Sequence, residues 1–77
     1  MTWDLEVDAE GLLCPLPVLK LRKALTRVGV GQVVRMRADD PAALVDVPHF
    51  CTEAGHEVLD QSEDANVLVF LVRKGGN

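Results

Sequence analysis

The stretch GLLCPLPVLKLRKAL, residues 11–25, decides the fold, because it holds the start of a helix and places a cysteine at that start. Pro15 suits the first helical turn, where the amide hydrogen that proline lacks would have no partner, and Pro17 is still tolerated within that turn. Leucine and valine side chains then repeat at helical spacing, with lysine and arginine on another face. We therefore predict an amphipathic helix that begins beside Cys14 and ends at Gly29.

Hydrophobic and charged residues alternate before and after this helix, which is the pattern of strands with one buried face. Residues 3–8 (WDLEVD) and 32–38 (QVVRMRA) predict two such strands. Residues 56–62 predict a third strand, and 66–74 a fourth, whose continuous apolar run favours a central place in the sheet. The EDAN segment between the last two strands predicts a hairpin-like turn.

A second helix is predicted between the second and third strands. Asp40 and Pro41 suit its N-cap and first helical position, and Gly55 suits its end. Pro48 lies where a straight helix would lose a hydrogen bond. The sequence therefore predicts either a break there or a short first turn followed by a restart that Asp46 would cap.

The predicted order is β-α-β-α-β-β in a chain of 77 residues, the size of one small domain spanning residues 1–77. Two amphipathic helices need an apolar surface to cover, and one face of a four-stranded sheet supplies it. We expect an α+β fold, a two-layer α/β sandwich with a mixed four-stranded sheet and both helices on one face. The core should be aliphatic, since 48% of the residues are hydrophobic while the aromatic ones are one tryptophan and two phenylalanines.

Composition narrows the functional classes. The net charge of −4 argues against nucleic acid as the main partner, because phosphate binding needs a basic surface. The longest apolar run, residues 67–72, is far too short to cross a membrane, and the acidic first ten residues do not resemble a secretion signal. We expect a reducing, cytoplasmic setting, where cysteines more often serve reactivity or packing, although the two cysteines permit one bridge on count alone.

Six of the eight basic residues fall within residues 20–37, a segment without acids. One basic patch on an acidic chain suggests a docking face for an acidic partner. An equally good interpretation is a solvated helix side whose charges compensate the helix dipole. The helical residues that would form the docking face are Lys20, Arg22, Lys23 and Arg27.

Cys14 is the candidate for chemistry. Directly before a helix, a thiolate would be stabilised by free backbone N–H groups and by the helix dipole, which lower the thiol pKa. Pro15 and Pro17 would hold the sulfur in a fixed, outward position. An apolar collar suited to contact with another protein would be formed by Leu12, Leu13 and Leu16. The alternative is a small buried residue of the core, which is the interpretation we favour for Cys51.

A metal site has weak support. Zinc needs three or four ligands at chelating spacing, whereas the chain offers only a loose His-x-Cys at residues 49–51, with His56 and Cys14 apart from it. Both histidines are expected at the surface or with satisfied hydrogen bonds. A Cys–His catalytic pair would need one of them to fold back onto Cys14. The chain lacks a C-x-x-C motif, so a dithiol cycle within one loop is excluded.

Three segments together resemble the TusA/SirA family of sulfur carriers over nearly the whole chain: VDAEGLLCPLPVLKLRKAL (7–25), ADDPAALVDVPHFCTEAGHEV (38–58) and FLVRKGG (70–76). The resemblance implies a fold similar to the C-terminal domain of bacterial initiation factor three. It also implies that Cys14, in its Cys-Pro-x-Pro motif, takes sulfane sulfur from a cysteine desulfurase as a persulfide. The sulfur would then pass to a downstream relay protein for 2-thiouridine formation at the tRNA wobble position.

The family is also linked to sulfur supply for molybdenum cofactor and to dissimilatory sulfur oxidation, so the pathway stays open. We expect no cofactor, metal, membrane or direct nucleic-acid partner, and a monomer, because a relay must exchange partners. As a sulfurtransferase-type carrier, the chain would hold a covalent group rather than act as a complete enzyme. The competing hypotheses are a nucleic-acid-binding or regulatory module, and a thiol redox protein that pairs Cys14 with Cys51.

Overall fold

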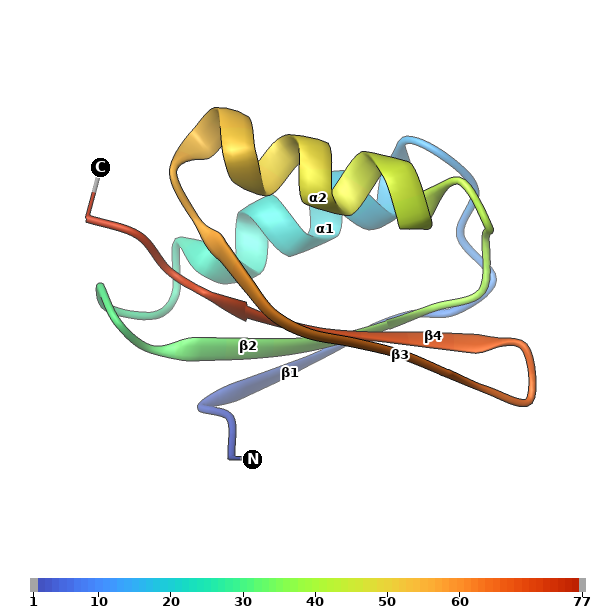
Figure 1. The fold of residues 1–77 in the computed structure, drawn as a ribbon, viewed down its shortest axis with the longest axis horizontal. Helices are drawn as coiled ribbons and strands as arrows, with labels where there is room; N and C mark the ends of the chain where they lie inside the picture. The colour runs from blue at the N-terminus through green and yellow to red at the C-terminus, as the bar shows by residue number, and fades with distance from the viewer. Residues whose placement is uncertain (1, 77) are drawn as a thin grey trace.

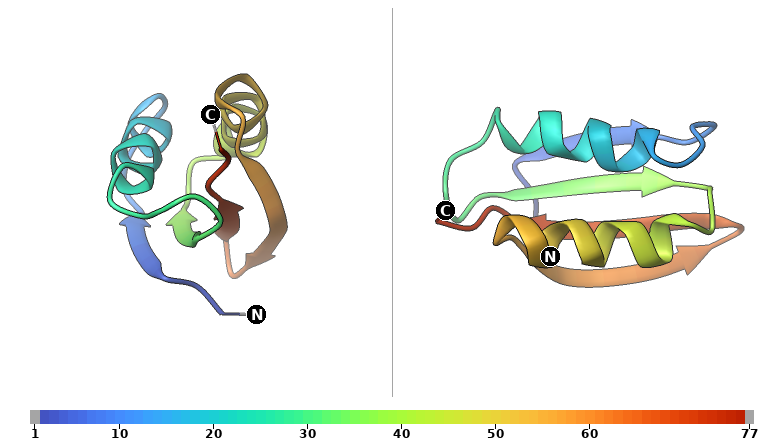
Figure 2. Two further views of the ribbon diagram at one scale, coloured as in Figure 1. Left: turned by 90° about the vertical axis from the view of Figure 1, so that its left-hand side faces the viewer. Right: turned by 90° about the horizontal axis from the view of Figure 1, so that it is seen from above.

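A computed structural model describes residues 2–76 and shows two helices over one sheet (Figure 1). The elements follow one another as β1 (Leu5–Ala9), α1 (Leu16–Leu25), β2 (Val33–Ala38), α2 (Ala43–Ala54), β3 (Glu57–Asp64) and β4 (Val67–Arg73). Both helices cover the same face of the sheet, as the two further views show (Figure 2). The predicted α+β sandwich with the order β-α-β-α-β-β is confirmed.

The sheet is mixed, with the strand order β1-β2-β4-β3. β1 pairs with β2 in parallel, whereas β4 runs antiparallel to both of its neighbours, β2 and β3. The continuously apolar β4 therefore lies inside the sheet, as its sequence predicted. The turn from β3 to β4 consists of Ala65 and Asn66, which both have positive φ (49° and 70°), as a type I′ hairpin turn requires.

The core lies between the helices and the sheet. Alternate residues of the two inner strands face the helices, and each is at most 4% exposed: Val34, Met36, Ala38, Leu68, Phe70 and Val72. The helices close the core with five side chains that are at most 2% exposed: Leu21, Leu25, Ala43, Val47 and Cys51. Phe70 is the largest fully buried side chain, so the core is built mainly from aliphatic residues around a single ring.

The outer face of the sheet carries an ion-pair network rather than a second helical layer. Arg35 and Arg37 project from β2, and both pair with Glu6 of the neighbouring strand. Arg37 also contacts Asp8 at 3.2 Å and Glu10 at 3.2 Å. The basic segment that the sequence shows at residues 20–37 is thus divided in space, because strand alternation turns these two arginines away from α1.

The helix boundaries differ from the predictions in two places. α1 ends at Leu25 rather than at Gly29, because Thr26 caps it, with the Thr26 hydroxyl donating to the Lys23 carbonyl at 2.6 Å. α2 begins at Ala43 rather than at Pro41, and Ala42 stands at the N-cap. Asp40 was expected there.

The predicted break at Pro48 is wrong, and so is a restart at Asp46, because α2 is continuous from Ala43 to Ala54. Proline removes a single amide donor from the ladder. Val47 and Cys51, on either side of Pro48, are 0% and 2% exposed, so burial of this face outweighs that loss. Gly55, with φ of 82°, ends the helix as predicted.

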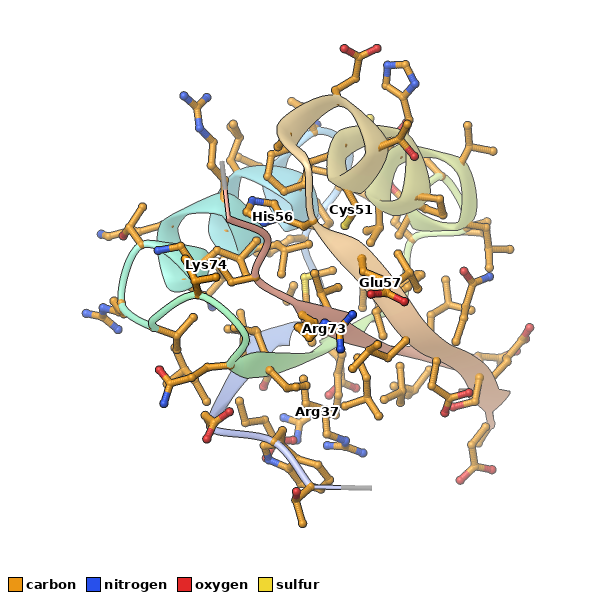
Figure 3. The ribbon with its side chains drawn as sticks, turned by 60° about the vertical axis from the view of Figure 1, so that its left-hand side comes forward. Arg37, Cys51, His56, Glu57, Arg73 and Lys74 are labelled. Atoms are coloured by element: carbon orange, nitrogen blue, oxygen red, sulfur yellow. The ribbon has the colours of Figure 1, made fainter. Side chains whose placement is uncertain are left out.

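β3 forms one edge of the sheet and is strongly acidic. A register irregularity between Val58 and Asp60 bends it, and the strand is exposed from Asp60 onward. At its first residue, Glu57 pairs with Arg73 of β4, and Figure 3 shows the two side chains next to each other. Its acidic residues are Glu57, Asp60, Glu63 and Asp64.

Candidate functional site

Cys14 lies in the loop that joins β1 to α1, immediately before the helix. Its side chain is exposed. The Leu16 amide donates to the Leu13 carbonyl at 2.8 Å, which forms a tight turn around the cysteine, and the Cys14–Pro15 peptide bond is cis. Pro17 is buried in the first turn of α1, so the helix start is anchored to the core while the sulfur stays at the surface.

Carboxylates from the β2–α2 connection and from α2 hold this loop in place. The Gly11 amide donates to both carboxylate oxygens of Asp39 at 3.0 Å, and the Cys14 amide donates to Asp40 Oδ2 at 2.7 Å. The Cys14 thiol donates to Asp46 Oδ2, with Sγ and the oxygen 2.9 Å apart. The connection from β2 to α2, together with the first turn of α2, therefore positions the cysteine through three acidic side chains.

The sequence pattern does not reveal these contacts, because it predicts Asp40 and Asp46 only as helix caps. Asp40 does organise the start of α2, since its Oδ1 accepts from the Ala42 amide at 3.0 Å. Its second oxygen, however, binds the Cys14 amide. The only signal in the sequence was the pair Asp39-Asp40 before a proline, and a local pattern does not show what lies 26 residues away.

The expectation that the helix lowers the pKa of Cys14 is wrong. The hydrogen bond to Asp46 raises this pKa, and desolvation by neighbouring side chains and the negative charges of Asp46 and Asp40 act in the same direction. The N-terminus of α1 offers few free amide hydrogens that could stabilise the thiolate. Pro15 and Pro17 have no amide hydrogen, and the Leu16 amide is already bound to the Leu13 carbonyl. The surroundings of Cys14 thus favour the protonated thiol over the thiolate.

An open groove of about 370 Å³ runs beside Cys14, between α1 and α2. Pro15, the N-cap of α1, and Val18 form one wall, and Phe50 of α2 contributes to the other. The polar side chains along it are Asp46, His49 and Glu53. A groove that is open to solvent and apolar along its walls fits a side chain or segment of another protein better than an enclosed small molecule.

The leucine collar is only partly as expected. Leu13 is 71% exposed and Leu16 is 48% exposed, so both present apolar surface next to Cys14. Leu12, which was expected in the same collar, is partly buried and packs against the core. Its position in the β1–α1 loop, where its amide donates to the Ala9 carbonyl at 3.3 Å, turns the side chain inward.

The four basic residues predicted to form a docking face, three in α1 and Arg27 just after it, do not form one surface. Lys20, Lys23 and Arg27 line a groove between α1 and β1 that Glu6 and Asp8 share. The Lys20 ammonium also donates to the Asp8 carbonyl. Arg22 lines a separate groove near the end of α2, together with Phe50 and His56. Any docking role for these residues would therefore involve two different sides of α1.

Cys51 is a core residue, as predicted. It is 2% exposed, and burial raises the pKa of its thiol to about 11. Both cysteines are free, so the structure contains no bridge between Cys14 and Cys51.

The two histidines also lie as predicted. His49 is at the surface and pairs with Glu53 at 3.9 Å. His56 is satisfied, because its Nδ1 accepts from the Gly75 amide at 3.0 Å, and its ring lies 5.8 Å from the Phe50 ring. Figure 3 shows His56 close to Lys74, whose charge, together with burial as the larger cause, lowers the pKa of His56. Among residues 2–76, no group of three histidine, cysteine or acidic side chains is arranged to hold a metal ion.

The fold and the site together define a class of protein: a small two-layer α/β domain that presents one exposed thiol at the tip of a helix. In the described part of the chain, neither helix has the length and hydrophobicity needed to cross a membrane.

Comparison with known proteins agrees with this class. Residues 5–74 match the family described as sulfurtransferase TusA. The sulfur carrier protein TusA of Pseudomonas entomophila is 41% identical over 71 residues, covering 92% of this chain and 89% of the relative. That of Allochromatium vinosum is 38% identical over 72 residues, covering 94% and 95%. The chain belongs to the TusA family of sulfur carrier proteins.

A solved structure supports the fold as well. The SirA-like protein from Desulfitobacterium hafniense superposes with a TM-score of 0.82 at 26% identity, covering 94% of this chain and 99% of that one. The resemblance to the TusA/SirA family that the sequence showed is therefore confirmed.

Proposed function

We propose that Cys14 accepts sulfane sulfur as a persulfide from a cysteine desulfurase and passes it to a downstream relay protein. Residues 1–77 act in this proposal as one sulfur-carrier domain, monomeric and cytoplasmic. The sulfur is used for 2-thiolation of the tRNA wobble uridine. The chain carries the group and does not complete a catalytic cycle alone, because both the donor and the acceptor of the sulfur are other proteins.

One observation carries this proposal: of the two cysteines, Cys14 is exposed at a helix tip beside an open apolar groove, while Cys51 is buried. A carrier needs a sulfur atom that two partners can reach in turn. Leu13 and Leu16 add exposed apolar surface around that atom. The family to which the chain belongs supports the same role.

The chemistry is thiol–persulfide exchange. The Cys14 thiolate attacks the terminal sulfur of the donor's cysteine persulfide, so that a new S–S bond forms on Cys14 as the donor's S–S bond breaks. The donor cysteine leaves as a thiolate, and the transferred sulfur keeps its proton. The acceptor's thiolate then attacks the terminal sulfur on Cys14 in the same way, which returns Cys14 to a thiolate. No external oxidant or reductant is needed.

Intact-mass measurement tests the proposal. After incubation with a cysteine desulfurase and free cysteine, the chain should gain the mass of one sulfur atom, about 32 Da, and lose it on reduction. Cys14→Ser should gain nothing, and Cys51→Ala, the matched control, should load like the parent. An unloaded parent chain, or equal loading of Cys14→Ser, would contradict the proposal.

Pathway and partner class need separate tests. A loaded chain that donates sulfur only to relay proteins of dissimilatory sulfur oxidation, or of molybdenum cofactor synthesis, would replace the tRNA assignment while leaving the carrier role intact. Salt-dependent RNA or DNA binding that survives Cys14→Ser would favour the nucleic-acid-binding or regulatory module instead.

A further inference from the structure

We propose that Asp46 is a positioning residue that restrains Cys14 in the free carrier, by holding the thiol hydrogen in an S–H···O hydrogen bond until a sulfur donor displaces it. This inference rests on the proposed function, because it assigns Asp46 a part in when Cys14 becomes reactive toward a donor.

The geometry supports a built contact. Cys14 Sγ and Asp46 Oδ2 are 2.9 Å apart although the residues are 32 positions apart in the chain. Each partner is fixed separately. The Asp46 amide donates to the Ala42 carbonyl at 2.9 Å within the start of α2. The Cys14 amide donates to Asp40 at 2.7 Å. The two side chains thus meet because two anchored segments converge, and not through the freedom of one surface chain.

The charges around the sulfur favour the protonated thiol. Besides Asp46, α2 brings His49 and Glu53 to the same groove, and Asp40 lies on the connection that leads to α2. From the α1 side, the groove is lined beside Cys14 by Pro15 and Val18, and neither titrates. The pKa of Cys14 is raised, with the hydrogen bond to Asp46 as the largest cause. Backbone hydrogen bonds from Ala42 and Cys14 lower the pKa of Asp40, so that carboxylate stays charged.

This arrangement has a consequence for loading. The thiolate, not the thiol, is the nucleophile in persulfide exchange. A free carrier whose thiol stays protonated reacts slowly with electrophiles that are not its partners. A donor must therefore relieve the restraint, by bringing a positive charge or a base into the mouth of the groove beside Asp46. The acidic surroundings of Cys14 suit such a basic group.

The pH dependence of Cys14 alkylation tests this inference without any desulfurase. Iodoacetamide modification, followed by intact mass, gives the pH of half-maximal rate for the parent chain, Asp46→Asn and Asp46→Ala. Asp46→Asn keeps the shape and an acceptor oxygen but removes the charge. We expect it to lower the half-maximal pH by about one unit, the size of a typical effect of one adjacent charge. Asp46→Ala, which removes the hydrogen bond as well, should lower it at least as far.

Asp60→Asn is the matched control, because it removes one negative charge on β3, opposite Leu71 on the face of the sheet away from the helices. Its half-maximal pH should stay at the parent value. Far-UV circular dichroism verifies that each variant is folded. An unchanged or raised half-maximal pH in both Asp46 variants would overturn the inference, and so would an equal fall in Asp60→Asn. Failure of the parent chain to load sulfur would overturn the proposed function instead, and would leave the alkylation result standing.

Discussion

Cys14 and Cys51 are the same residue type in two opposite settings, and both have a raised thiol pKa. At Cys51 the cause is burial in an apolar core, which also denies any partner access. At Cys14 the main cause is a hydrogen bond to Asp46, and the sulfur remains exposed. A restraint made by one carboxylate can be removed by a docking protein, whereas a restraint made by the core can be removed only by unfolding. Access, and not the direction of the pKa, separates the two thiols.

The largest expected difference between Cys14 and Cys51 is in the rate at which each thiol is alkylated. At neutral pH in the native state, Cys14 should be modified at least about a hundredfold faster than Cys51, because a buried thiol reacts only when the structure opens. Mass spectrometry of proteolytic fragments at several times of exposure to iodoacetamide measures both rates. In denaturant the two cysteines should react at similar rates. Comparable alkylation rates of the two cysteines in the native state would show that Cys51 is open to solvent. Access would then not separate the two thiols.

The next effect is on stability. Cys51→Ser should lower the free energy of unfolding by about 1–3 kcal/mol, because it buries a hydroxyl among apolar side chains that offer it no hydrogen bond. Cys14→Ser should leave the urea midpoint close to that of the parent, since a serine hydroxyl at the surface can be hydrated and can still donate to Asp46. Urea titration followed by circular dichroism compares them. A Cys14→Ser variant that loses as much stability as Cys51→Ser would mean that the exposed cysteine has a structural role.

The smallest effect concerns Asp40, which holds the backbone of Cys14 and has no counterpart at Cys51. Its pKa is lowered from the ordinary value of 3.8, because the amides of Ala42 and Cys14 donate to it. A carboxyl whose folded pKa is depressed stabilises the fold above its unfolded pKa, and this contribution is lost as the pH falls through the folded value. Asp40→Asn should therefore melt at a lower temperature than the parent at neutral pH.

The difference in melting temperature between the parent chain and Asp40→Asn should narrow once the pH falls below about 4, because the Asp40 carboxyl of the parent then becomes protonated and loses its charge. Differential scanning calorimetry over a pH series measures it. Asp60→Asn, at an exposed position of β3, serves as the comparison. A difference in melting temperature that stays constant with pH would show that the amide hydrogen bonds to Asp40, rather than its charge, stabilise the fold.

Most of the fold could be predicted from the sequence, because strands and helices leave local periodic patterns. The alternation of Val34 and Met36 with Arg35 and Arg37 placed β2 correctly, and the unbroken apolar run of β4 placed it inside the sheet. The predicted break at Pro48 is wrong for a physical reason. The rule for proline describes an isolated helix, whereas in α2 the burial of Val47 and Cys51 outweighs one missing hydrogen bond.

The site was harder to predict than the fold. The position and exposure of Cys14 follow from the turn and the prolines next to it in sequence. Its electrostatics do not, because Asp40 and Asp46 approach it from 26 and 32 residues away. Neighbours along the chain, taken alone, predict a lowered pKa for Cys14. Likewise, the basic segment looked continuous in sequence, but strand alternation moves Arg35 and Arg37 to the opposite face of the sheet.

The acidic edge strand β3 affects how the protein behaves at high concentration. An unpaired strand is a template on which a second copy can extend the sheet, and such growth leads to fibrils. Half of the residues of β3 are acidic, and an approaching β3 of another copy meets like charges at Asp60, Glu63 and Asp64. We expect β3 not to pair with a second copy, even at high concentration. The end of the molecule that carries Cys14 would then stay accessible to one partner protein after another.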